Sequence, residues 1–169
     1  MKHILLLRHA KSSWDEPGLD DFDRPLAKRG IKDAPRMGAF VEKCGYVPDH
    51  IISSPAKRAK QTASLFSESA GIESRGIQRE EDFYYGSAFD YLEAIQKSSE
   101  DYETIMVVGH NPKIEEAVSI LCSDQRSYPV RMPTAALVCV EHPAMKWSQV
   151  KEGTARIKWM VIPKLLKKL

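Results

Sequence analysis

Hydrophobic positions follow two alternating patterns along the chain. Short apolar runs at residues 3–7, 50–53 and 104–108 predict buried strands, because nearly every position in them is apolar. A weaker run predicts a short strand at residues 76–79. After these runs, apolar residues recur at intervals of three and four, which places them on one face of a helix. The pattern therefore predicts strands that alternate with helices.

The first predicted helix ends near Lys43. Pro35 lies within it, and proline lacks the N–H of an interior helical hydrogen bond, so we expect a break or a new start near Asp33. The apolar face of this helix is formed by Met37, Phe40, Val41 and Cys44.

Three further helices are predicted at residues 54–70, 87–98 and 111–121. Ser54-Pro55 and Asn111-Pro112 each combine a capping side chain with a proline at the first helical position, which is typical of a helix start. In the middle helix, one face is expected to carry Phe89, Leu92 and Ile95.

The last two predicted strands, at residues 136–141 and 155–162, have no helix between them and are expected to pair antiparallel. The whole pattern predicts an α/β protein: a three-layer α/β/α sandwich, with a mostly parallel central sheet and an antiparallel strand near the C-terminus. The 169 residues contain no repeat, low-complexity block or Gly/Ser linker, so one domain over residues 1–169 is expected. Residues 164–169 are expected to form a final turn or a solvated tail.

Composition excludes several classes of protein. Hydrophobic residues make up 43% and charged residues 28%, as in ordinary soluble proteins. The net charge of +2 gives no push toward nucleic acid or membrane, and no apolar stretch has the length of a membrane span or a signal peptide. Cys44, Cys122 and Cys139 lack CxxC spacing, so we expect reduced thiols and a cytoplasmic location.

Charge is distributed unevenly along the chain. Residues 15–23 carry five acids and no base, residues 24–60 carry nine bases and three acids, and residues 80–103 carry eight acids and one base. Such blocks are usually solvated faces. The basic block nevertheless contains Arg24 and Arg58, which matter for the chemistry below.

Basic and imidazole side chains follow three of the predicted strands. Arg8 and His9 follow the first strand, Arg58 lies in the first turn of the helix after the second, and His110 follows the strand at 104–108. Ligands of α/β sheets bind beyond the carboxyl ends of the strands, so these side chains are expected to meet there. Arginine forks and helix N-termini both favour phosphate.

This set of side chains suits phosphoryl transfer without a metal or a cofactor. A neutral imidazole attacks phosphorus and gives a phosphohistidine that water later hydrolyses. Arginines and a second, protonated histidine are expected to neutralise the phosphoryl oxygens.

Three segments resemble the signatures of the histidine phosphatase superfamily. Residues 7–10, 53–63 and 107–112 are similar to its Arg-His-Gly motif, its second arginine segment and its second histidine motif. The resemblance implies that His9 is the nucleophile that accepts phosphate. It also implies that the phosphoryl group is held by Arg8, Arg58 and His110.

Within that superfamily, the chain is most similar to the SixA phosphohistidine phosphatase branch. Arg24-Pro25-Leu26, followed by Gly30, resembles the loop and helix opening of that branch. The chain also has no segment long enough for the cap of acid phosphatases, nor the usual mutase lid. The resemblance implies that Arg24 contacts phosphate. Asn111, which follows His110, is expected to be a second substrate-binding residue.

Two features depart from the family pattern. Ala10 replaces the usual glycine and adds a methyl group beside the nucleophile, which is expected to affect the loop. Glu80, Glu81 and Asp82 lie where mutase-like members have a glutamate general acid, but no motif selects one of them, and an exposed acidic loop is the other interpretation. A missing acid would suit a phosphoramidate, because imidazole can depart neutral whereas an alkoxide needs a proton.

Four functions compete on this basis. The leading one is a metal-independent phosphatase that acts on phosphohistidine of a signalling or phosphotransfer protein. The main alternative is a phosphatase of a small phosphomonoester, with an acid among Glu80, Glu81 and Asp82. A phosphate-binding module without catalysis would need no nucleophile. A metallohydrolase would have to use His3, His9, His110 and the acids of residues 15–23, although the adjacent Arg8 repels cations.

Overall fold

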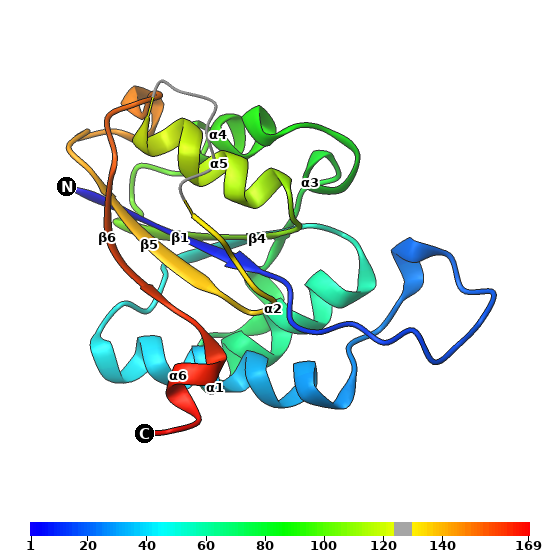
Figure 1. Cartoon of the computed structure of the whole chain (residues 1–169). Helices are drawn as coiled ribbons and strands as arrows, with labels where there is room; N and C mark the ends of the chain where they lie inside the picture. The colour runs from blue at the N-terminus through cyan, green and yellow to red at the C-terminus, as the bar shows by residue number, and fades with distance from the viewer. Residues whose placement is uncertain (124–129) are drawn as a thin grey trace.

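Six strands form one mixed sheet in the order β3-β2-β4-β1-β5-β6. The computed structural model describes residues 1–123 and 130–169 (Figure 1). The predicted three-layer α/β/α sandwich is confirmed, and each predicted strand is found within a residue or two of its expected bounds. The strands are β1 (Lys2–Arg8), β2 (His50–Ser53), β3 (Gln78–Arg79), β4 (Thr104–Gly109), β5 (Leu137–His142) and β6 (Arg156–Val161).

The central strand β1 is parallel to β4 and antiparallel to β5. Leu5 lies opposite Met106 in β4 and opposite Cys139 in β5. β2 is parallel to both β3 and β4, and β5 also pairs antiparallel with β6. The predicted antiparallel strand near the C-terminus is therefore β5. Because β1, β2 and β4 run in the same direction, their carboxyl ends meet at one edge of the sheet.

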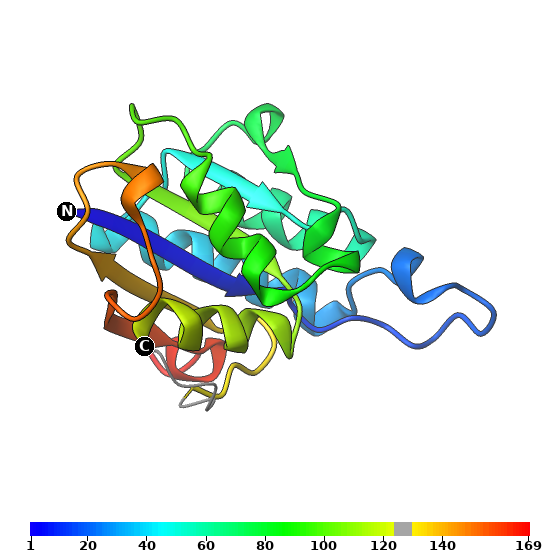
Figure 2. The same ribbon diagram turned by 90° about the horizontal axis from the view of Figure 1, so that it is seen from above.

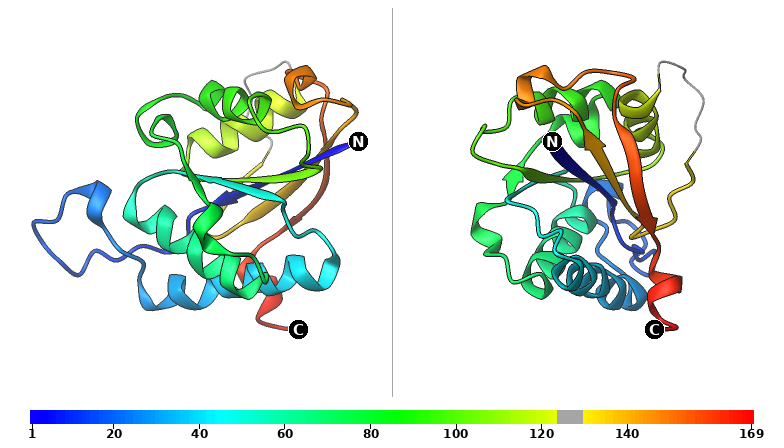
Figure 3. Two further views of the ribbon diagram at one scale, coloured as in Figure 1. Left: turned by 180° about the vertical axis from the view of Figure 1, so that it is seen from behind. Right: turned by 90° about the vertical axis from the view of Figure 1, so that its left-hand side faces the viewer.

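Helices cover both faces of the sheet, as Figures 1 and 3 show. Side chains of β1 alternate between the two faces: Leu5 and Leu7 pack against α1 and α2, whereas Ile4 and Leu6 pack against α4 and α5. One layer consists of α1 (Lys28–Cys44), α2 (Lys57–Ser69) and α6 (Pro163–Leu166). The other consists of α3 (Asp82–Tyr85), α4 (Ala88–Gln96) and α5 (Lys113–Cys122).

The predicted break in the first helix is wrong, because α1 continues through Pro35 without interruption. Proline costs the helix one hydrogen bond, to the carbonyl of Ile31, whose residue is 48% exposed. Packing against α2 holds the two halves of α1 together. At Gly38 the helix lies so close to the backbone of Phe66 that a Cβ atom would not fit.

Neither of the predicted capping side chains caps a helix. α2 begins at Lys57 rather than at Ser54-Pro55, and α5 begins at Lys113. Ser54 and Asn111 instead hydrogen-bond to other groups, described below. Ser87 is the residue that caps α4, where its hydroxyl accepts the N–H of Phe89.

The predicted apolar face of the 87–98 helix is only partly correct. Leu92 and Ile95 are buried, whereas Phe89 is 45% exposed. The predicted final turn is present as α6. Within the ranges described, no helix has the length and apolarity needed to cross a membrane.

The connection between β1 and α1 is a long loop that projects from the body of the molecule (Figure 2). We call residues 11–27 the strap. Its two ends are held together by a bridge between Ser12 and Leu26 and by the N–H of Ala27, which donates to Lys11 O at 2.8 Å. The outer part contains a single 3-10 turn, Asp21–Asp23. The acidic block of residues 15–23 therefore lies on the strap.

Candidate functional site

Three strand ends bring the candidate side chains together as predicted. The N–H of His9 donates to Gly109 O at 3.0 Å, and the N–H of Ser54 donates to Val108 O at 2.9 Å. The rings of His9 and His110 have centroids 5.1 Å apart. His9, Arg58 and His110 are 7%, 7% and 8% exposed. These largely buried side chains therefore lie together at the carboxyl edge of the sheet, and we call this cluster the recess.

His9 is oriented by its own loop. Its Nδ1 lies 2.7 Å from Ala10 O, and because a carbonyl only accepts, Nδ1 carries the proton. Nε2 then carries the lone pair. Burial lowers the pKa of His9 to about 3, the hydrogen bond to Ala10 O opposes this, and the charges of Arg58, Arg8 and Arg24 add to the lowering. At neutral pH the imidazole is uncharged, as a nucleophile requires.

His110 is held from a different strand end. Its Nε2 lies 2.7 Å from Ser54 Oγ, and its N–H donates to Tyr91 Oη at 3.3 Å. The Nδ1 atom is buried without a partner among the described residues. Burial, followed by the nearby His9 and Arg58, lowers the pKa of His110 to about 3. In the unliganded site burial therefore opposes a charge on His110. The expected protonation concerns the phosphate-bound site and stays a prediction.

The two arginines of the recess are held differently. Arg8 donates from Nη1 to Met132 O at 2.9 Å, and its Nε is buried without a partner among the described residues. Arg58 donates from Nη1 to Asp21 O at 2.6 Å and from Nη2 to Asp21 Oδ2 at 2.9 Å. Unpartnered N–H donors beside a neutral histidine are what an oxyanion would bind.

Arg24 belongs to the base of the strap. It is 8% exposed and donates to Ser13 O at 3.2 Å, to Asp21 Oδ1 at 2.9 Å and to the hydroxyl of Ser12. Its guanidinium carbon also lies 3.2 Å from the ring centroid of Trp14. The structure thus places Arg24 next to Arg58, through their shared partner Asp21.

Asn111 directly follows His110 and shares a hydrogen-bond acceptor with Arg8. Its Nδ2 donates to Glu115 Oε1 at 2.9 Å and to Met132 O at 3.0 Å, the carbonyl that also binds Arg8. Its Oδ1 is buried and has no partner among the described residues. The side chain therefore fixes the segment around Met132 beside Arg8.

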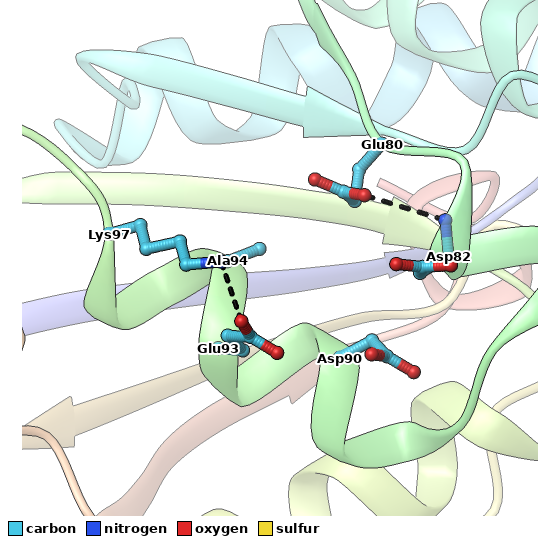
Figure 4. Close-up of a pocket in the computed structure, with 6 residues that line it drawn as sticks. All are labelled: Glu80, Asp82, Asp90, Glu93, Ala94 and Lys97. Carbon is cyan, nitrogen blue, oxygen red and sulfur yellow. Dashed lines mark hydrogen bonds and ion pairs between the residues drawn. The ribbon is translucent and has the colours of Figure 1, made fainter.

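The three candidate acids lie elsewhere. Glu80 and Asp82 line a small polar pocket of about 50 Å³ between α3 and α4 (Figure 4). Glu81 is exposed at the start of α3. Within residues 1–123 and 130–169, no hydrogen bond or ion pair joins any of these carboxyl groups to the recess. The other residues that line the pocket are Asp90, Glu93, Ala94 and Lys97.

Ala10 is accommodated by the fold. Its side chain is fully buried in the core between the sheet and α1 and α2, and its N–H donates to Thr62 Oγ1 at 2.9 Å. Its φ angle is not in the left-handed region. The extra methyl group thus packs into the core without requiring a left-handed backbone.

The histidines required by the metallohydrolase hypothesis do not converge. His3 lies at the start of β1, where its ring contacts Tyr46 with centroids 5.7 Å apart, whereas His9 follows the end of the same strand. In the part of the chain that is described, no three His, Cys, Asp or Glu side chains group as metal ligands.

Sequence reasoning missed several residues around the recess. Asp21 contacts both Arg24 and Arg58, and Tyr84 donates to Asp21 Oδ2 at 2.8 Å. The ring of Tyr84 also lies against His110, with centroids 5.5 Å apart. Asp21 stands three positions before Arg24, but nothing distinguishes it from the other acids of its block. Tyr84 lies in a segment without an apolar pattern, so no signal pointed to it.

The sequence profile of the histidine phosphatase superfamily (branch 1) matches residues 4–98. An uncharacterized chloroplastic protein of Arabidopsis thaliana is 38% identical over 128 residues, which cover 71% of this chain and 59% of that protein. The chain thus spans somewhat more than half of that relative. An uncharacterized protein of Mycobacterium tuberculosis is 30% identical over 166 residues, which cover 94% of this chain and 100% of that protein.

Solved structures share the whole fold. A structure from Agrobacterium tumefaciens, described as phosphohistidine phosphatase SixA, has a TM-score of 0.78 at 28% identity and covers 96% of this chain and 98% of its own. The protein histidine phosphatase SixA complexed with tungstate has a TM-score of 0.82 at 20% identity, with 97% of this chain and 99% of that chain covered. The second likeness bears on the fold alone.

Proposed function

The chain belongs to the histidine phosphatase superfamily and is a phosphatase of the SixA type, and from this premise we propose that it removes phosphate from phosphohistidine carried on another protein. Its partner would be a phosphorylated signalling or phosphotransfer protein in the cytoplasm. The name of the Agrobacterium tumefaciens structure supports this substrate class.

The proposed reaction proceeds in two displacements at phosphorus. Nε2 of His9 forms a bond to phosphorus while the P–N bond of the substrate breaks and its electron pair returns to the leaving imidazole. Water then attacks phospho-His9, the electron pair of that P–N bond returns to Nε2, and phosphate leaves with the oxygen of the water. During both steps Arg8, Arg58 and His110 bind the phosphoryl oxygens.

The observation that carries the choice of substrate is the protonation state of Asp21, whose carboxyl group is bonded to Arg58. Partial burial alone would raise the pKa of Asp21, but hydrogen bonds from Tyr84, Arg58 and Arg24 lower it to about 2. Asp21 is therefore ionised at neutral pH and cannot donate a proton to a leaving alkoxide. A phosphoryl imidazole whose other ring nitrogen is protonated departs neutral and needs no such donor.

The positions of Glu80, Glu81 and Asp82 also favour phosphohistidine over a phosphomonoester as the substrate. A phosphomonoesterase needs a protonated acid beside the leaving oxygen. Glu80 and Asp82 share their pocket with Asp90, Glu93 and Lys97 rather than with His9 (Figure 4).

The test compares initial rates on a phosphohistidine-carrying protein with rates on a panel of small phosphomonoesters, with His9→Ala as the inactive control. We expect faster turnover of the phosphohistidine protein and no effect of EDTA. Faster turnover of a sugar phosphate, together with its loss in Asp82→Asn or Glu80→Gln, would reverse the choice of substrate. Activity retained in His9→Ala would refute the covalent step, and phosphate binding without turnover would indicate a non-catalytic role.

A further inference from the structure

One carboxylate joins the strap to the candidate phosphate site. Asp21 Oδ2 accepts hydrogen bonds from Arg58 Nη2 at 2.9 Å and from Tyr84 Oη at 2.8 Å, while Oδ1 accepts from Arg24 Nη1 at 2.9 Å. The main-chain oxygen of Asp21 accepts a further bond from Arg58 Nη1 at 2.6 Å. Four donors from three separate segments thus converge on this residue. None of the sequence motifs contains it.

These contacts matter because the arginines they join carry like charges. Arg58 and Arg24 are 7% and 8% exposed, and their charges, with that of Arg8, all act on His9. Without an anion, guanidinium groups brought this close in a poorly solvated recess repel one another. A carboxylate bonded to both Arg58 and Arg24 offsets that repulsion. It holds the two groups in place before the phosphoryl group arrives.

The same geometry leaves Arg58 able to bind phosphate. A guanidinium has five N–H donors, and Asp21 takes one hydrogen from each of the two terminal nitrogens of Arg58. Two terminal hydrogens and the Nε–H remain. The side chain of Asp21 is 50% exposed, whereas that of Arg58 is 8% exposed, so the carboxylate lies at the rim and the guanidinium extends inward. The carboxylate thus supports Arg58 without using up its donors.

We propose that Asp21 is a positioning residue, which holds Arg58 and Arg24 in the orientation that binds the phosphoryl group and so makes the strap part of the site. Tyr84 contributes from α3 by donating to the same carboxylate oxygen as Arg58. Phe22, next to Asp21, packs edge-on against the ring of Tyr84 with centroids 5.1 Å apart. The strap is thereby fixed to the body at the point where it meets the site.

This inference rests on the proposed role of Arg58 in phosphate binding and not on the identity of the leaving group. Tungstate is therefore a suitable probe, with its dissociation constant measured by calorimetry. Asp21→Asn keeps the shape but replaces one acceptor oxygen with an NH₂ group, which meets a donor. Asp23→Asn is the matched control: it makes the same charge change on the same 3-10 turn, and the side chain of Asp23 forms no hydrogen bond or ion pair with another described residue.

Loss of one charge-assisted hydrogen bond predicts that Asp21→Asn binds tungstate about tenfold or more weakly. Asp23→Asn should stay within about twofold of the parent protein. Asp21→Glu restores the charge and should recover part of the affinity. Tyr84→Phe should weaken binding in the same direction by a smaller factor. With para-nitrophenyl phosphate, Asp21→Asn should lower kcat/KM and kcat, because the arginines act on the transition state.

Three results would overturn the inference. Tighter tungstate binding by Asp21→Asn would mean that Asp21 competes with the anion. Unchanged tungstate affinity would mean that Asp21 does not position the arginines. A lower Tm with an unchanged dissociation constant would mean that Asp21 only stabilises the fold. Arg58→Ala separates this failure from failure of the proposed function. If Arg58→Ala binds tungstate normally, the proposed phosphate site is wrong. If Arg58→Ala binds tungstate weakly but Asp21→Asn binds it normally, the site stands and the positioning role of Asp21 is wrong.

Discussion

Replacement of His9 by asparagine tests the neutral state of the candidate nucleophile. The side-chain amide of asparagine can take the place of Nδ1 and donate to Ala10 O, which His9 contacts at 2.7 Å. It cannot titrate. His9→Asn therefore keeps the local hydrogen bond and removes the ionisable group.

The magnitude follows from the lowered pKa. His9 has a pKa of about 3 in the folded protein against 6.5 for an unperturbed histidine. As the pH falls below 6.5, the unfolded chain takes up a proton that the folded chain does not, so acid lowers the free energy of unfolding. The slope is about 1.4 kcal/mol per pH unit for each such histidine, or about 2 kcal/mol between pH 6.5 and 5. His110 contributes in the same direction, because its pKa is also about 3.

The assay is urea unfolding at several pH values between 4.5 and 8, followed by the fluorescence of buried tryptophan such as Trp147. The parent protein should lose stability more steeply than His9→Asn below pH 6.5. The gap between the two should change by about 2 kcal/mol between pH 6.5 and 5. Parallel curves would refute the reasoning, since they would show that His9 takes up its proton in the folded state as well. If His9 did take up a proton in the folded state, the activity of the parent protein should also fall below pH 6.5. A neutral His9 predicts no such loss of activity.

Two further changes test how the site is held. Ser54→Ala removes the hydroxyl that lies 2.7 Å from His110 Nε2 and leaves both ring nitrogens of His110 unpaired. Tungstate affinity should fall, and the free energy of unfolding in urea should fall by about 1–3 kcal/mol. Unchanged kcat would contradict a role of Ser54 in orienting His110. Gly30→Ala places a methyl group against the carbonyl of Lys11 at the base of the strap and should cost about 1–3 kcal/mol in stability, whereas Gly76→Ala, which has open space around it, should be close to neutral.

The sheet and the core of the site could be predicted from local pattern. Strands buried on both faces are apolar at nearly every position, so β1, β2 and β4 stand out in the sequence. Because ligands gather at the carboxyl ends of such strands, Arg8, His9 and His110 could be placed together without any knowledge of helix packing. Only the positions at which the predicted strands end were needed for this step.

Helix boundaries near the site could not be predicted, because a polar side chain that can cap a helix can also bond to a group from a distant segment. Ser54 and Asn111 have the side chains and the following prolines of helix caps. In the fold, Ser54 contacts His110 and Asn111 contacts Met132 O. Capping is a local interaction, whereas these partners come from other strands and loops. Likewise, the local effect of Pro35 predicts a break in the helix, but the packing of α1 against α2 keeps the helix continuous.

The electrostatic balance of the site depends on pairs that are distant in sequence. Asp21 belongs to an acidic block that looks solvated, yet its partner Arg58 lies 37 positions away. With Asp21 ionised and both histidines neutral, an incoming phosphoryl dianion meets arginine charge that is already partly balanced. The pKa of His110 is lowered chiefly by burial, and a dianion beside its unpaired Nδ1 would raise that pKa. Proton uptake by His110 is therefore coupled to anion binding, and oxyanion affinity should increase as the pH falls toward 5, which calorimetry in buffers of different ionisation enthalpy would detect.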